Sequence, residues 1–401
     1  MDNEAKREPL VSGRIRRLPE YLFARLNALT AAARARGVDV IDFGMGNPDR
    51  PPHPFVIEKL CEVAHDPKAH RYSMSRGIPH LRKAIVRRYE DSYGVSLDPE
   101  TEAIATIGSK EGLTHLSFAL LDEGDTVVVP APTYPIHTIS VIMAGARPVT
   151  VPMRDPAGLL KTLGETIEKT TPKPRLLVLC FPNNPTTATV ELGFFEEVVD
   201  LARFHGLWVV HDLAYADLVF DGYKAPSFLQ ARGAKDVGVE FFSMTKSYNM
   251  AGWRVGFMVG NKGMVSTLTR MKSYLDYGMF TPVQVAAIAA LREGTEPCRE
   301  IAEVYRVRRD IMVDGLNKMG WPVEKPRATM YVWAALPEKF REMGSMKFAE
   351  LLLEKAEVLV SPGIGFGTEG DGHVRIALVE NDERIRQALR NMRRVIGERA
   401  A

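Results

Sequence analysis

The stretch that decides the fold is "SMTKSYNMAGWRVG", residues 243–256, which contains a single lysine, Lys246. An apolar run, "VEFF" (239–242), precedes it, and a second one, "VGFMVG" (255–260), follows it. This pattern predicts two strands joined by a loop rich in small polar residues. Taken alone, such a loop is typical of a solvated lysine. A chemical role for Lys246 requires other polar groups at the ends of neighbouring strands.

Apolar runs alternate with helical patterns from about residue 54 to residue 285. The runs span residues 103–108, 126–131, 147–152, 175–181, 207–213, 239–244 and 255–260. They are apolar on both faces, which indicates strands in a sheet that helices cover on each side. The alternation of strands with helices predicts an α/β fold.

The pattern changes after about residue 290. A long helix over about 296–320 is followed by "TMYVWAAL", a helix near 346–356, "VLVSPGIGF", "HVRIALV" and a terminal helix. This order predicts a smaller α+β domain. Residues 16–36 predict an amphipathic helix, and the first 50 residues cannot form a core alone. We therefore expect a large domain over 54–285 and a small domain formed by 1–53 together with 286–401.

Composition excludes several classes of protein. The chain has 401 residues, which suits two domains, and its formal net charge of +2 gives no reason to expect a nucleic-acid partner. Cys61, Cys180 and Cys298 fit neither a disulfide framework nor a zinc-site spacing, so we expect reduced cysteines and no metal. No signal peptide is apparent, and no apolar run reaches the roughly 18 residues of a membrane helix. We expect a soluble, cytoplasmic protein.

Several polar residues fall at the ends of the predicted strands, where α/β sheets bind ligands. "GSKEG" (108–112) opens a helix and is either an anion site or a turn capped by Ser109. "PNNPT" (182–186) is a turn that also offers amide donors. Asp212 in "HDLAY" (211–215) follows four apolar residues, so it needs a partner, either a structural cation or a ligand.

Together with Lys246 and Arg254, these strand ends offer an amine, a carboxylate, amide donors and phosphate-binding groups. Pyridoxal phosphate requires this set of groups. Its aldehyde needs a lysine, its ring nitrogen a carboxylate, its phenolic oxygen hydrogen-bond donors, and its phosphate a helix N-terminus with an arginine.

With these residues in place, the sequence resembles the fold-type I pyridoxal-phosphate aminotransferases of classes I and II. The resemblance covers nearly the whole chain and rests on Ser243-x-x-Lys246 followed by Gly252-Trp253-Arg254, with "NNPT" and "HDLAY" upstream. It implies a large domain with a mostly parallel seven-stranded sheet, a smaller α+β domain, pyridoxal 5'-phosphate as cofactor and a homodimer with shared active sites.

The resemblance also implies a role for each matching residue. Lys246 is the Schiff-base lysine and the base that moves the substrate α-proton, and Asp212 pairs with the pyridinium nitrogen. The other implied cofactor contacts are Tyr215 and Asn184 at the phenolic oxygen, Tyr134 on the ring, Ser109, Ser243, Arg254 and the backbone around Lys110 at the phosphate, and Tyr72 at the phosphate of the neighbouring subunit. Arg375 binds the substrate α-carboxylate, with Asn184 and the backbone of Gly46 close to the substrate.

The sequence departs from the family at one point, because Thr187 stands where Asn-Pro-Thr-Gly often places glycine. The local backbone after Asn184 is therefore open to change. The distal carboxylate of an acidic substrate needs a further cation. Lys110 and Arg76, the latter from a partner subunit, are the candidates, and Lys110 is equally well interpreted as a surface lysine at a helix start.

Longer segments such as "VPAPTYPIH", "VVHDLAYAD" and "SYLDYGMFTP" are similar to the bacterial alanine aminotransferases that use glutamate and pyruvate. Diaminopimelate, aspartate and methionine aminotransferases of the same family remain alternatives. A pyridoxal-phosphate β-lyase or decarboxylase would share the cofactor site. A non-enzymatic regulator with an aminotransferase-like domain is the alternative of a different class, and an intact Lys246 argues against it.

Overall fold

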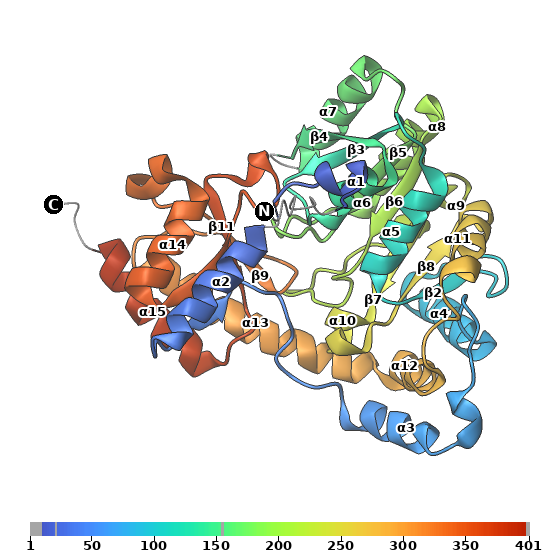
Figure 1. Cartoon of the computed structure of the whole chain (residues 1–401), viewed down its shortest axis with the longest axis horizontal. Helices are drawn as coiled ribbons and strands as arrows, with labels where there is room; N and C mark the ends of the chain where they lie inside the picture. Colours follow the sequence, from blue (N-terminus) through green and yellow to red (C-terminus); the bar gives the residue numbers. More distant parts are fainter. Residues whose placement is uncertain (1–9, 21, 154–155, 398–401) are drawn as a thin grey trace, which may run out of the picture.

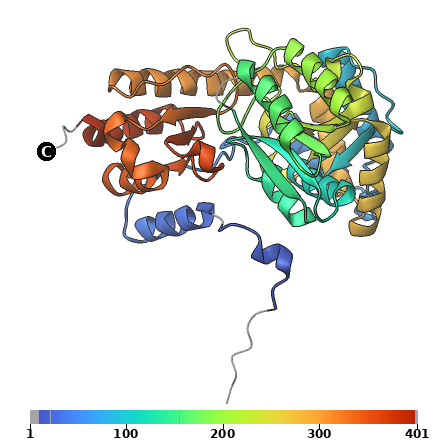
Figure 2. The same ribbon diagram turned by 90° about the horizontal axis from the view of Figure 1, so that it is seen from above.

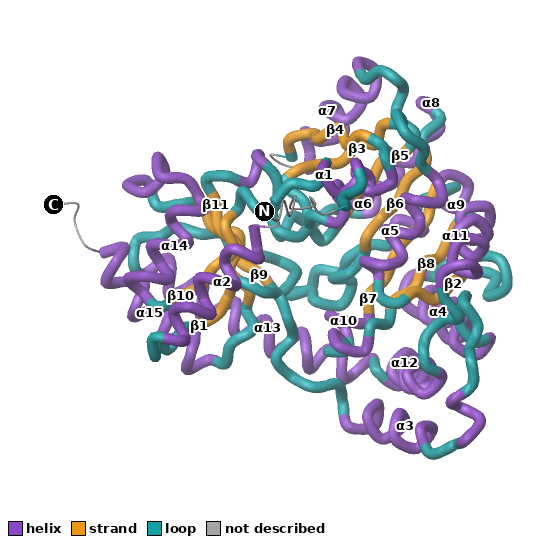
Figure 3. The backbone as a smooth tube through the Cα atoms, viewed as in Figure 1, coloured by secondary structure: helices purple, strands orange, loops and turns teal. Residues whose placement is uncertain are grey.

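Two β-sheets organise the computed structural model, which describes residues 10–20, 22–153 and 156–397 (Figures 1 and 3). The larger sheet has seven strands in the order β2-β8-β7-β6-β5-β3-β4. They are β2 (Ala103–Thr106), β3 (Thr126–Ala131), β4 (Arg147–Pro152), β5 (Leu176–Cys180), β6 (Trp208–Asp212), β7 (Gly238–Ser243) and β8 (Gly256–Gly260). Only β8 runs antiparallel to its neighbours, β7 and β2. The predicted mostly parallel seven-stranded sheet is confirmed.

Helices cover both faces of this sheet, because the side chains of each strand alternate between two cores. Val127 and Val129 of β3 belong to one core, and Val128 belongs to the other. On the first face lie α5 (Ser109–Leu120), α6 (Ile136–Ala144) and α11 (Lys262–Leu275). The second face carries α3 (Pro54–Ala64), α4 (Pro79–Tyr93), α7 (Pro156–Lys169), α8 (Leu192–His205), α9 (Ala234–Val237) and α12 (Thr281–Glu293).

The edge strand β4 differs from the sequence-based expectation. We expected residues 147–152 to be apolar and buried on both faces, but most of β4 is half-buried or exposed. Among the described strands it pairs only with β3, so it forms an edge of the sheet, and part of its surface is exposed. Edge strands tolerate such residues, and Pro148 and Pro152 remove hydrogen-bond donors that a neighbouring strand would need.

The second sheet has the order β1-β10-β11-β9. Its strands are β1 (Ile41–Phe43), β9 (Tyr331–Ala335), β10 (Val358–Pro362) and β11 (His373–Ala377). Around it pack α13 (Thr295–Lys318), α14 (Gly344–Ala356) and α15 (Asp382–Gly397). The parallel pairing of β1 with β10 joins the N-terminal segment to the C-terminal part of the chain. Figure 2 shows α13 reaching from the second sheet towards the helices beside the first.

The N-terminal region forms two helices where one was predicted over 16–36. They are α1 (Gly13–Arg16) and α2 (Leu22–Ala35). Pro19 explains the break, because it has no backbone N–H and disfavours a helical residue before it. α1 contacts α6 of the large sheet, whereas Leu26 of α2 shares a core with Leu353 of α14.

The division into domains stays a proposal, and the two sheets with their separate cores support it. The boundary expected at residue 285 falls inside α12, which packs on α3 and α4. We propose to place the boundary at Gly294, between α12 and α13. The remaining short elements are α10 (Met244–Ser247) and the 3₁₀ turns η1 (Pro67–His70), η2 (Phe228–Gln230), η3 (Ala251–Trp253), η4 (Glu338–Met343) and η5 (Thr368–Gly370).

The three cysteines are free, as expected from their spacing. Cys61 is exposed, and Cys180 and Cys298 are buried. Within the described part of the chain, no helix is both long and apolar enough to cross a membrane.

Candidate active site

The polar residues singled out in the sequence meet because parallel strands end at one edge of the sheet. Cys180 of β5 pairs with Asp212 of β6, which pairs in turn with Phe241 of β7. Asn184, Tyr215 and Lys246 follow the ends of these three adjacent strands. The ends of β2 and β3 add the start of α5 and Tyr134. Since β8 is antiparallel, it begins at the same edge, two residues after Arg254.

A cavity of about 170 Å³ lies at this edge. Every predicted site residue except Tyr72 and Arg76 lines it. The lining consists of Met45, Gly46, Ser109, Lys110, Tyr134, Cys180, Asn184, Asp212, Ala214, Tyr215, Ser243, Thr245, Lys246, Arg254, Tyr331 and Arg375. Residues from both sheets contribute, because Gly46 follows β1, Tyr331 begins β9 and Arg375 lies in β11.

Asp212 has one satisfied and one unsatisfied carboxylate oxygen. Its side chain is buried, and Oδ2 lies 3.0 Å from Nε2 of His137. The hydroxyl of Thr133 lies 2.6 Å from Nδ1 of the same imidazole and holds the ring in place. Oδ1 is also buried, but it has no hydrogen-bond partner among the described residues. A purely structural ion pair would leave this oxygen unexplained, because buried acceptors are normally paired.

Lys246 lies in the short helix α10, and Ser243 caps that helix by accepting a hydrogen bond from the backbone N–H of Thr245. The Nζ of Lys246 donates a hydrogen bond to the backbone oxygen of Gly46. Burial lowers the pKa of Lys246, and the positive charges of Arg375 and Arg254 lower it further, against an opposing effect of Tyr331. This environment favours the neutral amine, which can accept a proton.

Arg254 and the start of α5 form a compact cationic corner. Arg254 has a left-handed backbone, with φ +55°, and donates a hydrogen bond from Nη1 to the oxygen of Ala251 at 3.0 Å. Gly108 has φ +79°, and a Cβ there would clash with the guanidinium of Arg254. At Gly256, a Cβ would lie 2.7 Å from the backbone nitrogen of Ser109. Glycines at these two positions let the arginine approach the N-terminus of α5, where N–H groups attract an anion.

Arg375 is held for bidentate binding by groups from both sheets. It is 4 % exposed and therefore does not face solvent, although it lies in a strand. Nη1 donates to Oδ1 of Asn184 at 2.8 Å, and Nη2 donates to the oxygen of Gly44 at 3.0 Å. Nδ2 of Asn184 donates to the hydroxyl of Tyr215 at 3.1 Å. Asn184 therefore joins the predicted carboxylate-binding group to the predicted phenolic-oxygen donor.

Tyr331 is a site residue that the sequence reasoning missed. Its hydroxyl lies 3.0 Å from that of Tyr215, and the guanidinium of Arg375 lies 4.3 Å from its ring centre. Burial alone would raise the pKa of Tyr331, but the charges of Arg375 and Lys246 outweigh burial and lower it. A side chain at Gly46 would clash with the Tyr331 hydroxyl, so glycine is required there. The only signal in "TMYVWAAL" is a hydroxyl-bearing residue in an apolar strand. Other missed lining residues are Met45, Cys180, Ala214 and Thr245.

Tyr72 and Arg76 lie outside the cavity of their own chain. Tyr72 is 87 % exposed, and its ring centre is 4.8 Å from that of Tyr277. Arg76 is turned to Glu100, with 3.8 Å between Nη1 and Oε2 and a further hydrogen bond to the Glu100 backbone oxygen. Of the two candidates for a distal carboxylate, Lys110 is the one at the cavity.

Thr187 has a left-handed backbone conformation, which a glycine would adopt easily. Its φ is +63°, and its backbone N–H donates to the oxygen of Asn183 at 3.0 Å. A β-branched residue is an uncommon occupant of this region, because its Cβ crowds the backbone. The turn after Asn184 is therefore retained despite the departure from the family motif.

Comparison with known proteins agrees with this arrangement. The family model described as aminotransferase class I and II matches residues 38–392. The chain is 59 % identical to the glutamate-pyruvate aminotransferase AlaC of Escherichia coli (strain K12), over 95 % of this chain and 92 % of that protein. It is 47 % identical to the LL-diaminopimelate aminotransferase of Moorella thermoacetica, over 96 % and 98 % of the two chains. A solved structure of a Thermus thermophilus aspartate aminotransferase mutant superposes with a TM-score of 0.88 at 29 % identity, covering 97 % of this chain and all of that one. The chain is an aminotransferase that belongs to the class I and II family.

Proposed function

We propose that the protein uses pyridoxal 5'-phosphate to transfer the amino group of glutamate to pyruvate, forming 2-oxoglutarate and alanine. The observation that carries the cofactor proposal is the unpartnered, buried Oδ1 of Asp212, in a cavity that Lys246 also lines. A protonated ring nitrogen would give this oxygen the donor that it lacks. The residues at the cavity also fit the phosphate, the phenolic oxygen and the ring of the cofactor.

Each remaining part of the cofactor has a matching group at the cavity. Arg254, Ser109 and Ser243 would hold the phosphate, with the backbone N–H groups at the start of α5. Tyr215 and Asn184 would hydrogen-bond the phenolic oxygen. Tyr134 lines the same cavity and offers an aromatic face to the ring.

The bound cofactor would supply an electron sink that makes the substrate α-proton acidic. The chain's own residues do the rest. Arg375 orients the substrate through its α-carboxylate, since a guanidinium binds a carboxylate with two parallel hydrogen bonds. The Nζ of Lys246, with its lowered pKa, accepts the proton from the substrate Cα. The same Nζ donates the proton again at a later step of the amino-group exchange. Asp212 holds its negative charge against the ring nitrogen, and burial keeps water from competing.

The substrate proposal rests on similarity and on Lys110. The relative at 59 % identity is named for glutamate and pyruvate, and relatives at 41–47 % are named for LL-diaminopimelate. Lys110 is exposed and lies at the cavity, where its ammonium can meet the second carboxylate of glutamate. Diaminopimelate is the second candidate, because those relatives also match nearly the whole chain.

An absorption spectrum with product analysis tests the proposal. The purified protein should show a visible or near-ultraviolet cofactor band that changes on addition of glutamate or alanine. Lysine and diaminopimelate should leave it unchanged. Glutamate plus pyruvate should yield alanine and 2-oxoglutarate. A band that responds to diaminopimelate and not to glutamate contradicts the substrate proposal, and the absence of any band contradicts the cofactor proposal.

We also propose a homodimer with shared active sites. A group of large apolar side chains is exposed, which is unusual for a surface that only meets water. It comprises Tyr72, Met74, Tyr274, Leu275, Tyr277 and Phe280. A second copy seated on this group would bury it and bring Tyr72 towards the neighbouring cavity, as the family resemblance implies.

Replacing Arg375 with lysine should raise the KM for glutamate and for alanine by about 10- to 100-fold. One charge-assisted hydrogen bond, worth roughly 1.5–3 kcal/mol, is lost when the bidentate donor becomes a single ammonium. The hydrogen bonds that the two terminal nitrogens of Arg375 donate to Asn184 and Gly44 are lost as well. Steady-state kinetics with both amino acids provide the measurement. An unchanged KM for both would show that another group binds the α-carboxylate.

Replacing Lys110 with alanine should raise the KM for glutamate about 3- to 10-fold and leave the KM for alanine within twofold. Only glutamate has a distal carboxylate, and a partly exposed ion pair contributes about 1 kcal/mol at most. Half-reaction rates with each amino acid separate the two effects. The matched control is Lys262→Ala, since Lys262 is an exposed lysine that also begins a helix. Equal losses for both amino acids would assign Lys110 to the cofactor instead.

A further inference from the structure

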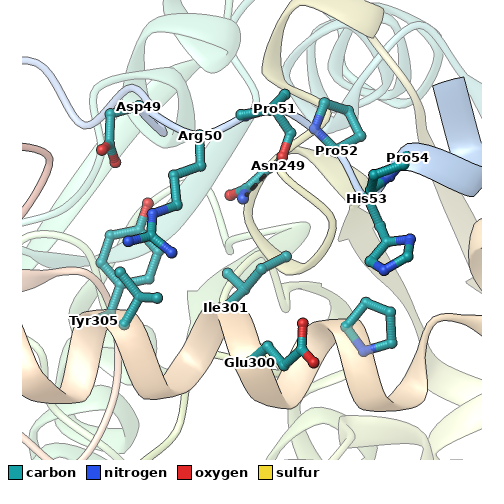
Figure 4. Close-up of a pocket in the computed structure, with 12 residues that line it drawn as sticks. Asp49, Arg50, Pro51, Pro52, His53, Pro54, Asn249, Glu300, Ile301 and Tyr305 are labelled. Carbon is teal, nitrogen blue, oxygen red and sulfur yellow. Dashed lines mark hydrogen bonds between the residues drawn. The ribbon is translucent and has the colours of Figure 1, made fainter.

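A second cavity lies behind the segment that carries Gly46. We call residues 47–54 the strap, because they connect β1 and Gly46 to α3. The cavity has a volume of about 230 Å³ and lies between the strap, Asn249 and the first turns of α13 (Figure 4). It is lined by Asp49, Arg50, Pro51, Pro52, His53, Pro54, Asn249, Pro297, Glu300, Ile301, Val304 and Tyr305. None of these residues lines the candidate active site.

Two opposite charges, on Arg50 and Glu300, line this cavity. Figure 4 shows Arg50 extending from the strap towards α13 and Glu300 rising from α13 on the opposite wall, with Ile301 between them in this view. In the part of the chain that the structure describes, neither Arg50 nor Glu300 takes part in a hydrogen bond or an ion pair. By contrast, the neighbouring Asp49 is bound by both terminal nitrogens of Arg308, at 2.7 Å each.

Asn249 adds a polar atom, its Oδ1, that lacks a partner among the described residues. It is buried, with 7 % of its surface exposed, and its side chain points into the space between the strap and α13 (Figure 4). Its Nδ2 donates a long hydrogen bond, 3.4 Å, to the oxygen of Pro51. Its Oδ1 accepts no hydrogen bond from any described residue. A buried carbonyl oxygen without a donor is unfavourable, so it points to a donor that a ligand would bring.

We propose that this cavity binds a free aliphatic α-amino acid. Arg50 receives the carboxylate, and Glu300 together with Oδ1 of Asn249 receives the ammonium group. The prolines of the strap, Ile301 and Val304 surround the side chain. The volume is below the roughly 300–1,000 Å³ of pockets for drug-sized molecules, which suits a small ligand. An acidic amino acid is disfavoured, because its second carboxylate would lie near that of Glu300.

The position of the cavity connects such a ligand to the active site. Asn249 follows Lys246 by three residues, and the strap begins next to Gly46, whose backbone oxygen accepts the Lys246 hydrogen bond. An amino acid held between Arg50 and Asn249 therefore contacts both segments that meet at Lys246. We expect its binding to slow hydrogen exchange at the backbone amides of the strap that are not prolines.

Isothermal titration calorimetry with L-valine tests this site on the protein purified with its cofactor. Valine could also enter the active site, so the titration is repeated with Arg375→Ala, which weakens binding there. Valine should still bind Arg375→Ala, and its Kd at the cavity beside the strap should lie within about twofold of the wild-type value for that cavity. Arg50→Gln and Glu300→Gln should each weaken this binding at least about tenfold, one charge-assisted contact being lost in each. Glu303→Gln, on the same helix and paired with Arg306, is the matched control.

The results separate this proposal from the proposed function. Arg50 and Glu300 are exposed, so their variants should fold and should exchange amino groups between glutamate and pyruvate at the wild-type rate. Ile301→Phe fills the cavity and should abolish valine binding without removing a charge. Valine binding that is lost in Arg375→Ala and unchanged in Arg50→Gln would overturn the proposal, as would the absence of any binding in the wild type. Failure of amino transfer in the wild type would instead overturn the proposed function.

Discussion

Replacing Asp212 with asparagine is expected to reduce kcat for glutamate by about 10²- to 10³-fold, the usual effect of removing one preorganised electrostatic group from an active site. Asparagine keeps the shape of the side chain and can still meet His137, which lies 3.0 Å from Oδ2. Only the negative charge and the acceptor at Oδ1 change. Without that charge, the ring nitrogen is not kept protonated, and the electron sink weakens.

Initial rates of the glutamate half-reaction, with the absorption spectrum as a second readout, check this expectation. Asp212→Ala should be at least as impaired, because it also leaves His137 without its acceptor. Asp221→Asn is the matched control. Asp221 is a half-exposed carboxylate that pairs with the buried Arg309, and neither residue lines the cavity, so turnover should stay near normal. If Asp212→Asn also turned over at a near-normal rate, the role assigned to Asp212 would be wrong.

The sequence could predict the large sheet because its strands carry strong local signals. The seven apolar runs are long, and turns bound each of them, so the seven strands lie where they were expected. The site residues at the strand ends could be found for a related reason. A polar residue such as Asp212, at the carboxyl end of a buried strand of an α/β sheet, is expected to lie at the edge where ligands bind. That the roles fit together depended on the family resemblance, because spacing alone left Ser109 and Asp212 open.

What the sequence did not reveal depends on contacts between distant segments. Tyr331 begins an ordinary apolar strand, and only the approach of the second sheet brings its hydroxyl to Tyr215. His137 lies within a helical pattern, and nothing near it in the chain indicates that it would bind Asp212. Pro19 is a local signal for a break in a helix, and the prediction of a single helix over 16–36 did not take it into account. Tyr72 cannot be tested within one chain, since its expected target is on another subunit.

Lys246 carries the second large effect. Lys246→Ala should lower the rate of amino transfer by at least about 10²- to 10⁴-fold, the contribution of a positioned general acid–base group. Lys246→Arg should be equally impaired although it keeps a basic group and nearly the length. A guanidinium stays protonated and cannot accept the α-proton, whereas burial and two neighbouring arginines favour a neutral amine at Lys246.

Stopped-flow measurement of the glutamate half-reaction separates the proton-transfer role from a loss of structure. A small primary amine added to Lys246→Ala should restore part of the rate in proportion to its concentration, because it can occupy the space left by the side chain. Restoration should fail in Lys246→Arg, where that space is filled. Lys262→Ala, which alters an exposed lysine, should behave like the wild type. If Lys246→Ala kept a near-normal rate without added amine, the proton would have to be moved by another group at the cavity, and Tyr331, whose pKa is also lowered, would be the residue to replace next.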